Sequence, residues 1–214
     1  MANARTIDVG PDRLERWLAG FAERHGPTRF EALDDALRCV GADGAVAVVT
    51  SAFPPLPTNW ADADPARAFV AHACASRVIA LVLVRLGGYA AGVFDGDQAL
   101  ATKVGARQVH GRSSAGGWSQ QRFARRREGQ VKVALETATD NAVTVVLPFL
   151  HRIDAVVTGG DRQALRAVLA DRRLDALRPL VVPRILDVPD PKARVLHASI
   201  AAARAVTITL SDDA

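Results

Sequence analysis

The chain has 214 residues, of which 49% are hydrophobic and 23% are charged, and its mean hydropathy is close to zero (+0.08). This length and composition predict a globular protein of one large or two small domains, and they exclude a disordered, collagen-like or disulfide-stapled chain. The formal net charge of +4 at pH 7 and the pI of about 9.7 are a modest basic excess that identifies no partner by itself.

The two cysteines, Cys39 and Cys74, are far apart and belong to no Cys/His cluster. They predict two buried thiols in a reducing compartment, with neither a zinc site nor a disulfide framework. The first residues, MANARTIDVGPDRLERW, lack the apolar stretch of a signal sequence, and the longest apolar runs, such as VIALVLV, have the length of a strand. We therefore expect a cytoplasmic protein.

The N-terminal part predicts a helix followed by a β-hairpin. Apolar residues recur at helical spacing between Pro11 and Gly26: Leu14, Trp17, Leu18 and Phe21. Two β-rich arms follow around an Asp43-Gly44 turn, and the Pro-rich, acidic stretch PPLPTNWADADP then predicts a connector. We place a domain boundary there, with a small α+β N-terminal extension at residues 1–66 and the main domain at residues 67–214.

The main domain predicts a mixed α/β fold. From Ser76, strand-like runs separated by the turn pairs Gly87-Gly88 and Asp95-Gly96 predict a three-stranded antiparallel meander. A long helix follows, with Ser119 as a candidate N-cap and apolar positions at helical spacing: Phe123, Val131, Leu135 and Ala138. Strands and helices then alternate, including a helix start after TGG and a last strand VTITL. This order predicts a mixed β-sheet with helices on both faces.

Basic residues concentrate between Lys103 and Lys132, where a single acid, Glu128, accompanies them. The basic positions are Lys103, Arg107, Arg112, Arg122, Arg125, Arg126, Arg127 and Lys132. Such a cluster predicts a polyanionic partner whose phosphates it would contact without reading sequence.

A glycine pair and two glutamines stand directly ahead of the arginines. A glutamine amide does not titrate near neutrality, so it is no general base, but it can orient a water against an electrophile or organise donors around an oxyanion. The glycines permit positive φ values and a close backbone approach. Spacing alone leaves open that this is an ordinary flexible loop ahead of a solvated arginine face.

The segment HGR…GGWSQQRFARRR resembles the catalytic loop of the eukaryotic and archaeal class-one translation release factors. The residues on that pattern are His110, Gly111, Arg112, Gly116, Gly117, Ser119, Arg122, Phe123, Ala124, Arg125 and Arg127. Two departures stand out: residues 113–115 lengthen the loop, and Trp118 occupies the place of the essential glutamine. GWSQ at Gly117 to Gln120 instead resembles the Gly-x-Ser-Gln version of the Vms-type release-factor-like (VLRF) peptidyl-tRNA hydrolases, in a compact bacterial, actinobacterial-type form.

This resemblance implies a release-factor middle-domain (ribonuclease H-like) architecture and a peptidyl-tRNA hydrolase of ribosome quality control. Its substrate would be a nascent chain on a stalled ribosome or split large subunit. The implied catalytic residue is Gln120, or Gln121 if the loop register differs. The implied catalytic loop contains Gly116, Gly117, Trp118, Ser119 and Gln121, and the implied RNA contacts are His110, Arg112, Arg122, Arg125, Arg126 and Arg127.

The expected partners are large-subunit rRNA and peptidyl-tRNA, with no membrane, no DNA, no metal and no organic cofactor. A non-catalytic ribosome- or RNA-binding module is the alternative, because the arginines could dock a loop that has lost hydrolysis. A nuclease would also suit the ribonuclease H-like architecture. The meander strands, however, carry no Asp/Glu cluster able to hold Mg²⁺, since Asp95 and Asp97 fall in a turn.

Overall fold

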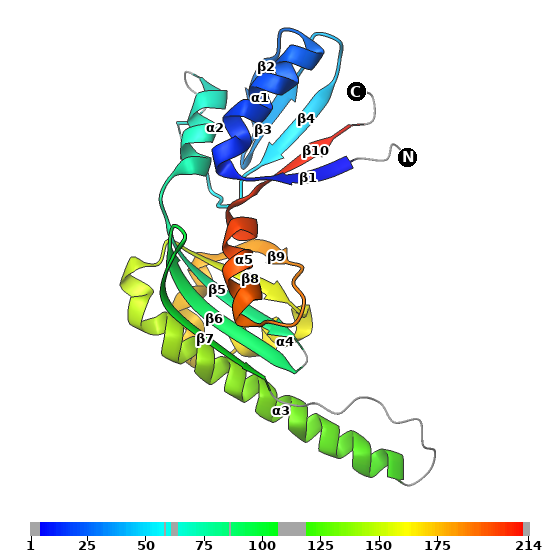
Figure 1. Cartoon of the computed structure of the whole chain (residues 1–214), viewed down its shortest axis with the longest axis vertical. Coiled ribbons are helices and arrows are strands. Elements are labelled where there is room, and N and C mark those ends of the chain that lie inside the picture. Colours follow the sequence, from blue (N-terminus) through cyan, green and yellow to red (C-terminus); the bar gives the residue numbers. More distant parts are fainter. Residues whose placement is uncertain (1–4, 58, 61–63, 86, 107–118, 212–214) are drawn as a thin grey trace. The chain divides into compact units, whose positions relative to one another are not determined.

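The computed structural model describes residues 5–57, 59–60, 64–85, 87–106 and 119–211, and for residues 119–127 it describes the backbone alone. The chain divides into two compact units. One consists of Met1–Ser76 together with Ala201–Ala214, and the other of Arg77–Ile200. Each unit has its own five-stranded sheet (Figure 1).

The first unit is an antiparallel sheet with two helices. Its strands, in the order β1-β10-β4-β3-β2, are β1 (Arg5–Val9), β10 (Val206–Leu210), β4 (Val46–Thr50), β3 (Ala36–Val40) and β2 (Arg29–Ala32). The helices α1 (Pro11–His25) and α2 (Pro65–Cys74) share one core with the sheet. Leu14, Phe21, Leu37, Phe69 and Ile208 are completely buried in it. The predicted helix and the turn at Gly44, where φ is 90°, are both confirmed.

This unit contains more than the predicted helix and hairpin, and its limits differ from the predicted boundary at residue 66. Helix α2 starts inside the proposed connector, where Pro65 is at the first turn and the Asp64 carboxylate accepts a hydrogen bond from Arg67 N at 3.0 Å. The last strand of the chain also belongs here, because Ile208 of β10 pairs with Ile7 of β1 and Val49 of β4. Both elements complete the core of this unit.

The prediction of two buried thiols is wrong for one of them. Cys39 lies in β3 and is fully buried, and this burial raises the pKa of its thiol to about 12. Cys74 is exposed because it is the last residue of α2, where its Sγ donates to Pro11 O at 3.3 Å.

The second unit has a mixed sheet in the order β7-β6-β5-β8-β9. The strands are β5 (Val78–Arg85), β6 (Gly88–Asp95), β7 (Gln98–Ala106), β8 (Ala155–Gly160) and β9 (Val181–Leu186). Strands β5 to β7 form the predicted antiparallel meander, and β8 and β9 add in parallel next to β5.

Helices cover both faces of this sheet, which confirms the predicted α/β class. The helical elements are α3 (Ser119–Val146), the 3-10 helix η1 (Leu147–Arg152), α4 (Arg162–Leu169), the 3-10 helix η2 (Arg172–Leu180) and α5 (Ala193–Arg204). Ala91 and Val93 of β6 share a core with α3, α4 and η2. The neighbouring residue Phe94 faces α5, where its ring and that of His197 meet edge to face at a centroid distance of 5.5 Å.

The glycine pair of TGGDRQAL marks the predicted helix start after a buried strand. Gly160 closes β8 with φ at 105°, and a Cβ there would collide with the Val84 carbonyl. Asp161 then caps α4, because its side chain accepts a hydrogen bond from Ala164 N at 2.7 Å.

One apolar stretch of this unit, Glu128–Arg152, has the length and composition of a membrane span, with a mean hydropathy of 1.2. Its buried residues include Ala138, Ala142, Val145 and Val146, which pack in the core against the sheet. The same apolar composition is therefore explained by the packing of a core helix.

Replacing Ile208 by Ala should lower the free energy of unfolding of the first unit by about 2–5 kcal/mol. The Ile208 side chain is completely buried on a strand paired on both sides, so its truncation leaves a cavity. Denaturant unfolding followed by Trp17 and Trp60 fluorescence measures this in a Trp118→Phe background, since both tryptophans contact the core of this unit. Thr209→Ala, one residue along on the other face of β10, is the control and should change little. Equal effects of the two substitutions would contradict the assignment of β10.

Candidate functional site

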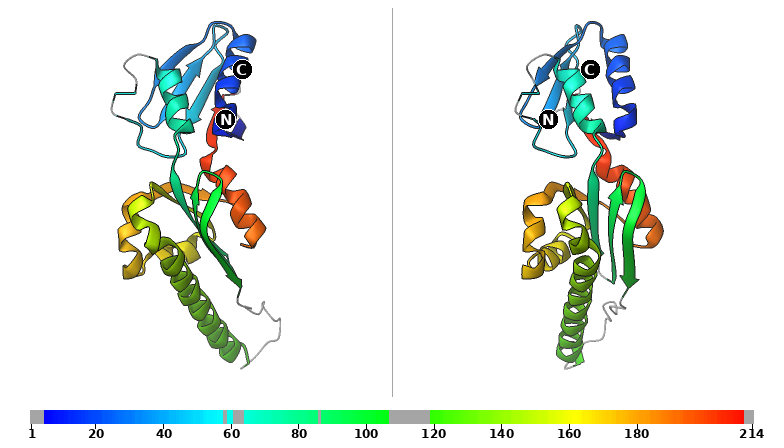
Figure 2. Two further views of the ribbon diagram at one scale, coloured as in Figure 1. Left: turned by 60° about the vertical axis from the view of Figure 1, so that its left-hand side comes forward. Right: turned by 90° about the vertical axis from the view of Figure 1, so that its left-hand side faces the viewer.

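Helix α3 carries the candidate site at its N-terminal end. It spans Ser119–Val146, a length of about 42 Å at 1.5 Å per residue. Its C-terminal half packs on the sheet through residues such as Ala138, Ala142 and Val145. Its N-terminal half extends past the end of β7 in Figures 1 and 2. We call its first part, residues 119–130, which precede the residues that line the cavity against α4, the α3 arm.

The structure places part of the predicted site on the arm. The candidates that lie in the first turns of α3 are Ser119, Gln120, Gln121, Arg122, Arg125, Arg126 and Arg127. The other candidates lie outside the described residues: His110, Arg112, Gly116, Gly117 and Trp118. The predicted N-cap, Ser119, is the first residue of the helix itself. Both candidate glutamines are thus in helical backbone, directly after the segment that contains the glycine pair.

The end of the arm favours anions by its backbone alone. The first N–H groups of a helix have no partner within the helix, and the aligned peptide dipoles add a partial positive charge at the N-terminus. The first turn of α3 contains no acidic residue to neutralise that charge. A polyanion at this end would meet a favourable potential in addition to the arginine charges.

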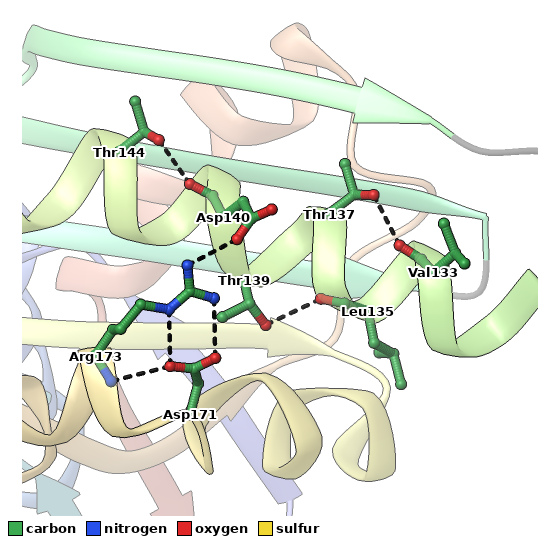
Figure 3. Close-up of polar contacts among 8 residues, drawn as sticks. All are labelled: Val133, Leu135, Thr137, Thr139, Asp140, Thr144, Asp171 and Arg173. Carbon is green, nitrogen blue, oxygen red and sulfur yellow. Dashed lines mark hydrogen bonds and ion pairs between the residues drawn. The ribbon is translucent and has the colours of Figure 1, made fainter.

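The middle of α3 is rich in residues that do not favour a helix. Thr137, Thr139 and Thr144 each donate their hydroxyl to the carbonyl four residues earlier, at 2.7, 2.9 and 2.7 Å (Figure 3). Such bonds compete with the backbone ladder and weaken or bend a helix. Tertiary contacts must therefore support this section.

An arginine of η2 contacts this section on one flank, through side chains that are both exposed. Arg173 donates from Nη1 to Asp140 of α3 at 2.8 Å, and from Nε and Nη2 to the two oxygens of Asp171 at 2.9 Å (Figure 3). Hydrogen bonds from Arg173 lower the pKa of Asp171 to about 2, and the carboxylates raise the pKa of Arg173. The sequence carries no signal for this contact, because Asp140 and Arg173 are far apart in the chain.

A buried amide holds α3 to the edge strand of the meander. Asn141 is 2% exposed, and its Nδ2 donates to Lys103 O of β7 at 3.2 Å. Its Oδ1 is buried and has no hydrogen-bond partner among the described residues. The sequence pattern did not predict this residue, because an asparagine in a helix is usually read as a solvent-facing one.

A cavity of about 250 Å³ lies between α3, α4 and the turn from β5 to β6. On the α3 side it is lined by Val131, Ala134, Leu135 and Ala138. The apolar stripe of α3 is therefore only partly covered where the arm leaves the sheet.

The nuclease alternative requires a group of carboxylates that could hold Mg²⁺. Asp95 ends β6 and pairs with Arg152 at 3.3 Å. In the part of the chain that the structure describes, no group of three or more His, Cys, Asp or Glu residues is arranged to hold a metal ion.

Comparison with protein families matches the second unit and the last strand of the first. The family model of the Actinobacteria/chloroflexi VLRF1 release factor matches residues 77–209. The chain belongs to this family. The match confirms the resemblance to release-factor-like proteins of the Vms type. No protein of curated function matches the chain in sequence.

Solved structures similar to this VLRF1 family member include two archaeal proteins. An archaeal translation termination factor, aRF1, is 14% identical, with 95% of this chain and 68% of that chain covered and a TM-score of 0.44. A structure described as an archaeal protein is 11% identical, with 94% and 67% covered and a TM-score of 0.41. The Vms1 mitochondrial localization core is 12% identical, with 92% and 80% covered and a TM-score of 0.38.

The pKa of Asp171 should rise from about 2 toward its ordinary value of about 3.9 when Arg173 is replaced by Ala. Because the folded-state pKa is depressed, the stabilisation by this pair is present above about pH 4 and is lost as the pH falls toward 2. Carboxyl-carbon NMR titration measures the pKa directly. Arg178→Ala, which removes the partner of Asp175, is the control and should leave the Asp171 titration unchanged. An Asp171 pKa near 3.9 in the unmodified chain would contradict the network.

Proposed function

We propose that this protein is a peptidyl-tRNA hydrolase that releases nascent chains from stalled ribosomes or split large subunits. The observation that carries the proposal is the release-factor-like motif, of which Gln120 and the arginines stand at the end of an arm that extends past the sheet. Membership of a release-factor family supports the same reaction.

In this proposal the arm inserts the segment around Gln120 into the peptidyl-transferase centre. Gln120 orients a water whose oxygen attacks the carbonyl carbon of the ester between the nascent chain and the tRNA. The bond from that carbon to the ribose oxygen breaks, the leaving oxygen takes a proton, and a free carboxyl group forms. Since glutamine is neutral, its contribution is orientation and hydrogen bonding, and the surrounding RNA supplies further polar stabilisation.

The basic residues of the arm hold RNA. Arg122, Arg125, Arg126 and Arg127 contact rRNA or tRNA phosphates, because folded RNA is recognised mainly through its shape and backbone. His110 and Arg112 brace the segment from the β7 side, and Trp118 stacks on a base or packs at the base of the loop. The reaction takes place at the large ribosomal subunit in the cytoplasm and uses no metal or organic cofactor.

A second candidate is a docking module without catalysis. Trp118 stands where the release factors have their glutamine, and this departure favours a loop that has kept RNA binding and lost hydrolysis. The two functions differ in what the glutamine does, so substitution of the glutamine separates them.

Replacing Gln120 by Ala should lower the rate of nascent-chain release by about 100-fold or more at equal ribosome occupancy, because misplacing a reacting group costs that order of rate. Release of a labelled chain from purified complexes carrying peptidyl-tRNA measures the rate. Gln121→Ala is the matched control, with the same side chain removed one residue along. Loss of release by Gln121→Ala alone would assign the role to Gln121. Binding without release by the unmodified protein, on both intact ribosomes and large subunits, would establish the docking module instead.

Replacing Arg125 and Arg126 by Gln should weaken ribosome binding and reduce its dependence on salt. Each lost phosphate contact should lower the slope of log K against log salt by about 0.7–0.9. Binding to large subunits across a salt series measures the slope. Arg162→Gln with Arg166→Gln removes the same charge from exposed positions on α4 and is the control. Equal slopes for the two double variants would show that the effect is one of net charge alone.

A further inference from the structure

The α3 arm is a long lever anchored at one end. Between Ser119 and Asn141 the helix rises about 33 Å, so a tilt of about 1° at Asn141 moves the end of the arm by roughly 0.6 Å. Catalytic groups need placement to within about 0.5 Å. The angle at which α3 leaves the sheet therefore decides whether a group at its end is in position.

Apolar packing alone does not set that angle. Hydrophobic contacts are non-directional, and the cavity between α3 and α4 leaves the side of Ala134, Leu135 and Ala138 incompletely packed. The threonines of this section, each bonded to its own helix backbone, add further compliance. A helix packed in this way can tilt toward the cavity unless directional contacts hold it.

Two directional contacts meet α3 at consecutive residues. Asn141 bonds to the carbonyl of Lys103 in β7, and Asp140 bonds to Arg173 of η2. Consecutive residues point about 100° apart around a helix. The two contacts therefore lie on different sides of α3 at nearly the same position along its axis. Strand β7 ends at Ala106, so the Asn141 contact joins α3 to the strand that precedes residues 107–118 in the chain.

We propose that Asn141, assisted by the Asp140–Arg173 ion pair, is a positioning residue that sets the tilt of the α3 arm and so places Gln120 in its first turn. The predicted effect of Asn141 on the reaction rests on the proposed function. The predicted effect on the tilt of the arm is independent of it.

The unpartnered atom of Asn141 makes the role testable. Its buried Oδ1 has no described partner, so the amide costs stability that an apolar side chain of similar size would not. Asn141→Leu should therefore keep or raise the thermal midpoint. If Asn141 had a purely structural role, its replacement would lower the thermal midpoint.

Asn141→Leu should reduce the release rate at saturating ribosomal complexes by at least about 10-fold, with unchanged affinity for the ribosome and no loss of thermal stability. Val145→Ala is the stability control, because it removes core volume from the same helix and leaves both contacts intact. Thr144→Val is the local control, because among the described residues its hydroxyl bonds to Asp140 O of its own helix and to no other element. Unchanged release by Asn141→Leu, or a loss no greater than that of Val145→Ala, would overturn the proposal.

A measurement on the arm itself separates this inference from the proposed function. Spin labels at the exposed positions Glu128 on the arm and Ala176 in η2, in a Cys39→Ala, Cys74→Ser background, report the distance between them. Asn141→Leu should broaden or shift that distance distribution, and Thr144→Val should not. If the unmodified protein releases no chain, the proposed function fails, and a broadened distribution still supports the positioning role of Asn141. An unchanged distribution overturns that role whatever the release assay shows.

Discussion

The packing of the C-terminal half of α3 on the mixed sheet is the constraint on which the candidate site depends. A helix of about 42 Å is too long to be supported over its whole length by strands of eight or nine residues, so part of it must project. The buried stripe of α3 ends in the region of Leu135 and Ala138, and the basic segment lies beyond it. The sheet thus anchors α3 at its C-terminal end, and the candidate residues lie in the backbone of its first turns.

Because the arm projects from the sheet, a small change in the angle of α3 moves its end by a large distance. Buried apolar contacts supply most of the stability of the anchor, but they do not fix direction. The hydrogen bonds of Asn141 and Asp140 are directional and restrict the angle of α3. The Oδ1 atom of Asn141 is buried and has no hydrogen-bond partner among the described residues. A polar group that lowers stability where a long lever is anchored is typical of structure used for positioning.

The two sheets of the chain follow different rules. In the second unit, strands that neighbour one another in the sequence mostly pair with one another, so the meander could be read from its turn pairs. In the first unit, the sheet is completed by a strand from the far end of the chain, and residues 77–200 are inserted between its parts. Local patterns cannot show such a pairing, because a short strand such as VTITL fits either sheet equally well.

The sequence by itself determined the fold class, the long helix, the meander and the basic motif. Each of these rests on local regularities: helical or alternating spacing, Gly-containing turns and the order of residues in one continuous segment. It also located the helix start after TGG, because a glycine pair follows a buried strand there, whereas the structure identified Asp161 as the cap. It did not reveal α2, whose start signals lie within a Pro-rich stretch, or β1 and β2, which are short and partly exposed. Only the tertiary structure decided where β10 pairs, that Cys74 is exposed, and that Asn141 and Asp140 grip α3 from β7 and η2. These depend on contacts between residues far apart in the chain, and the free energy of such contacts appears only when the elements pack.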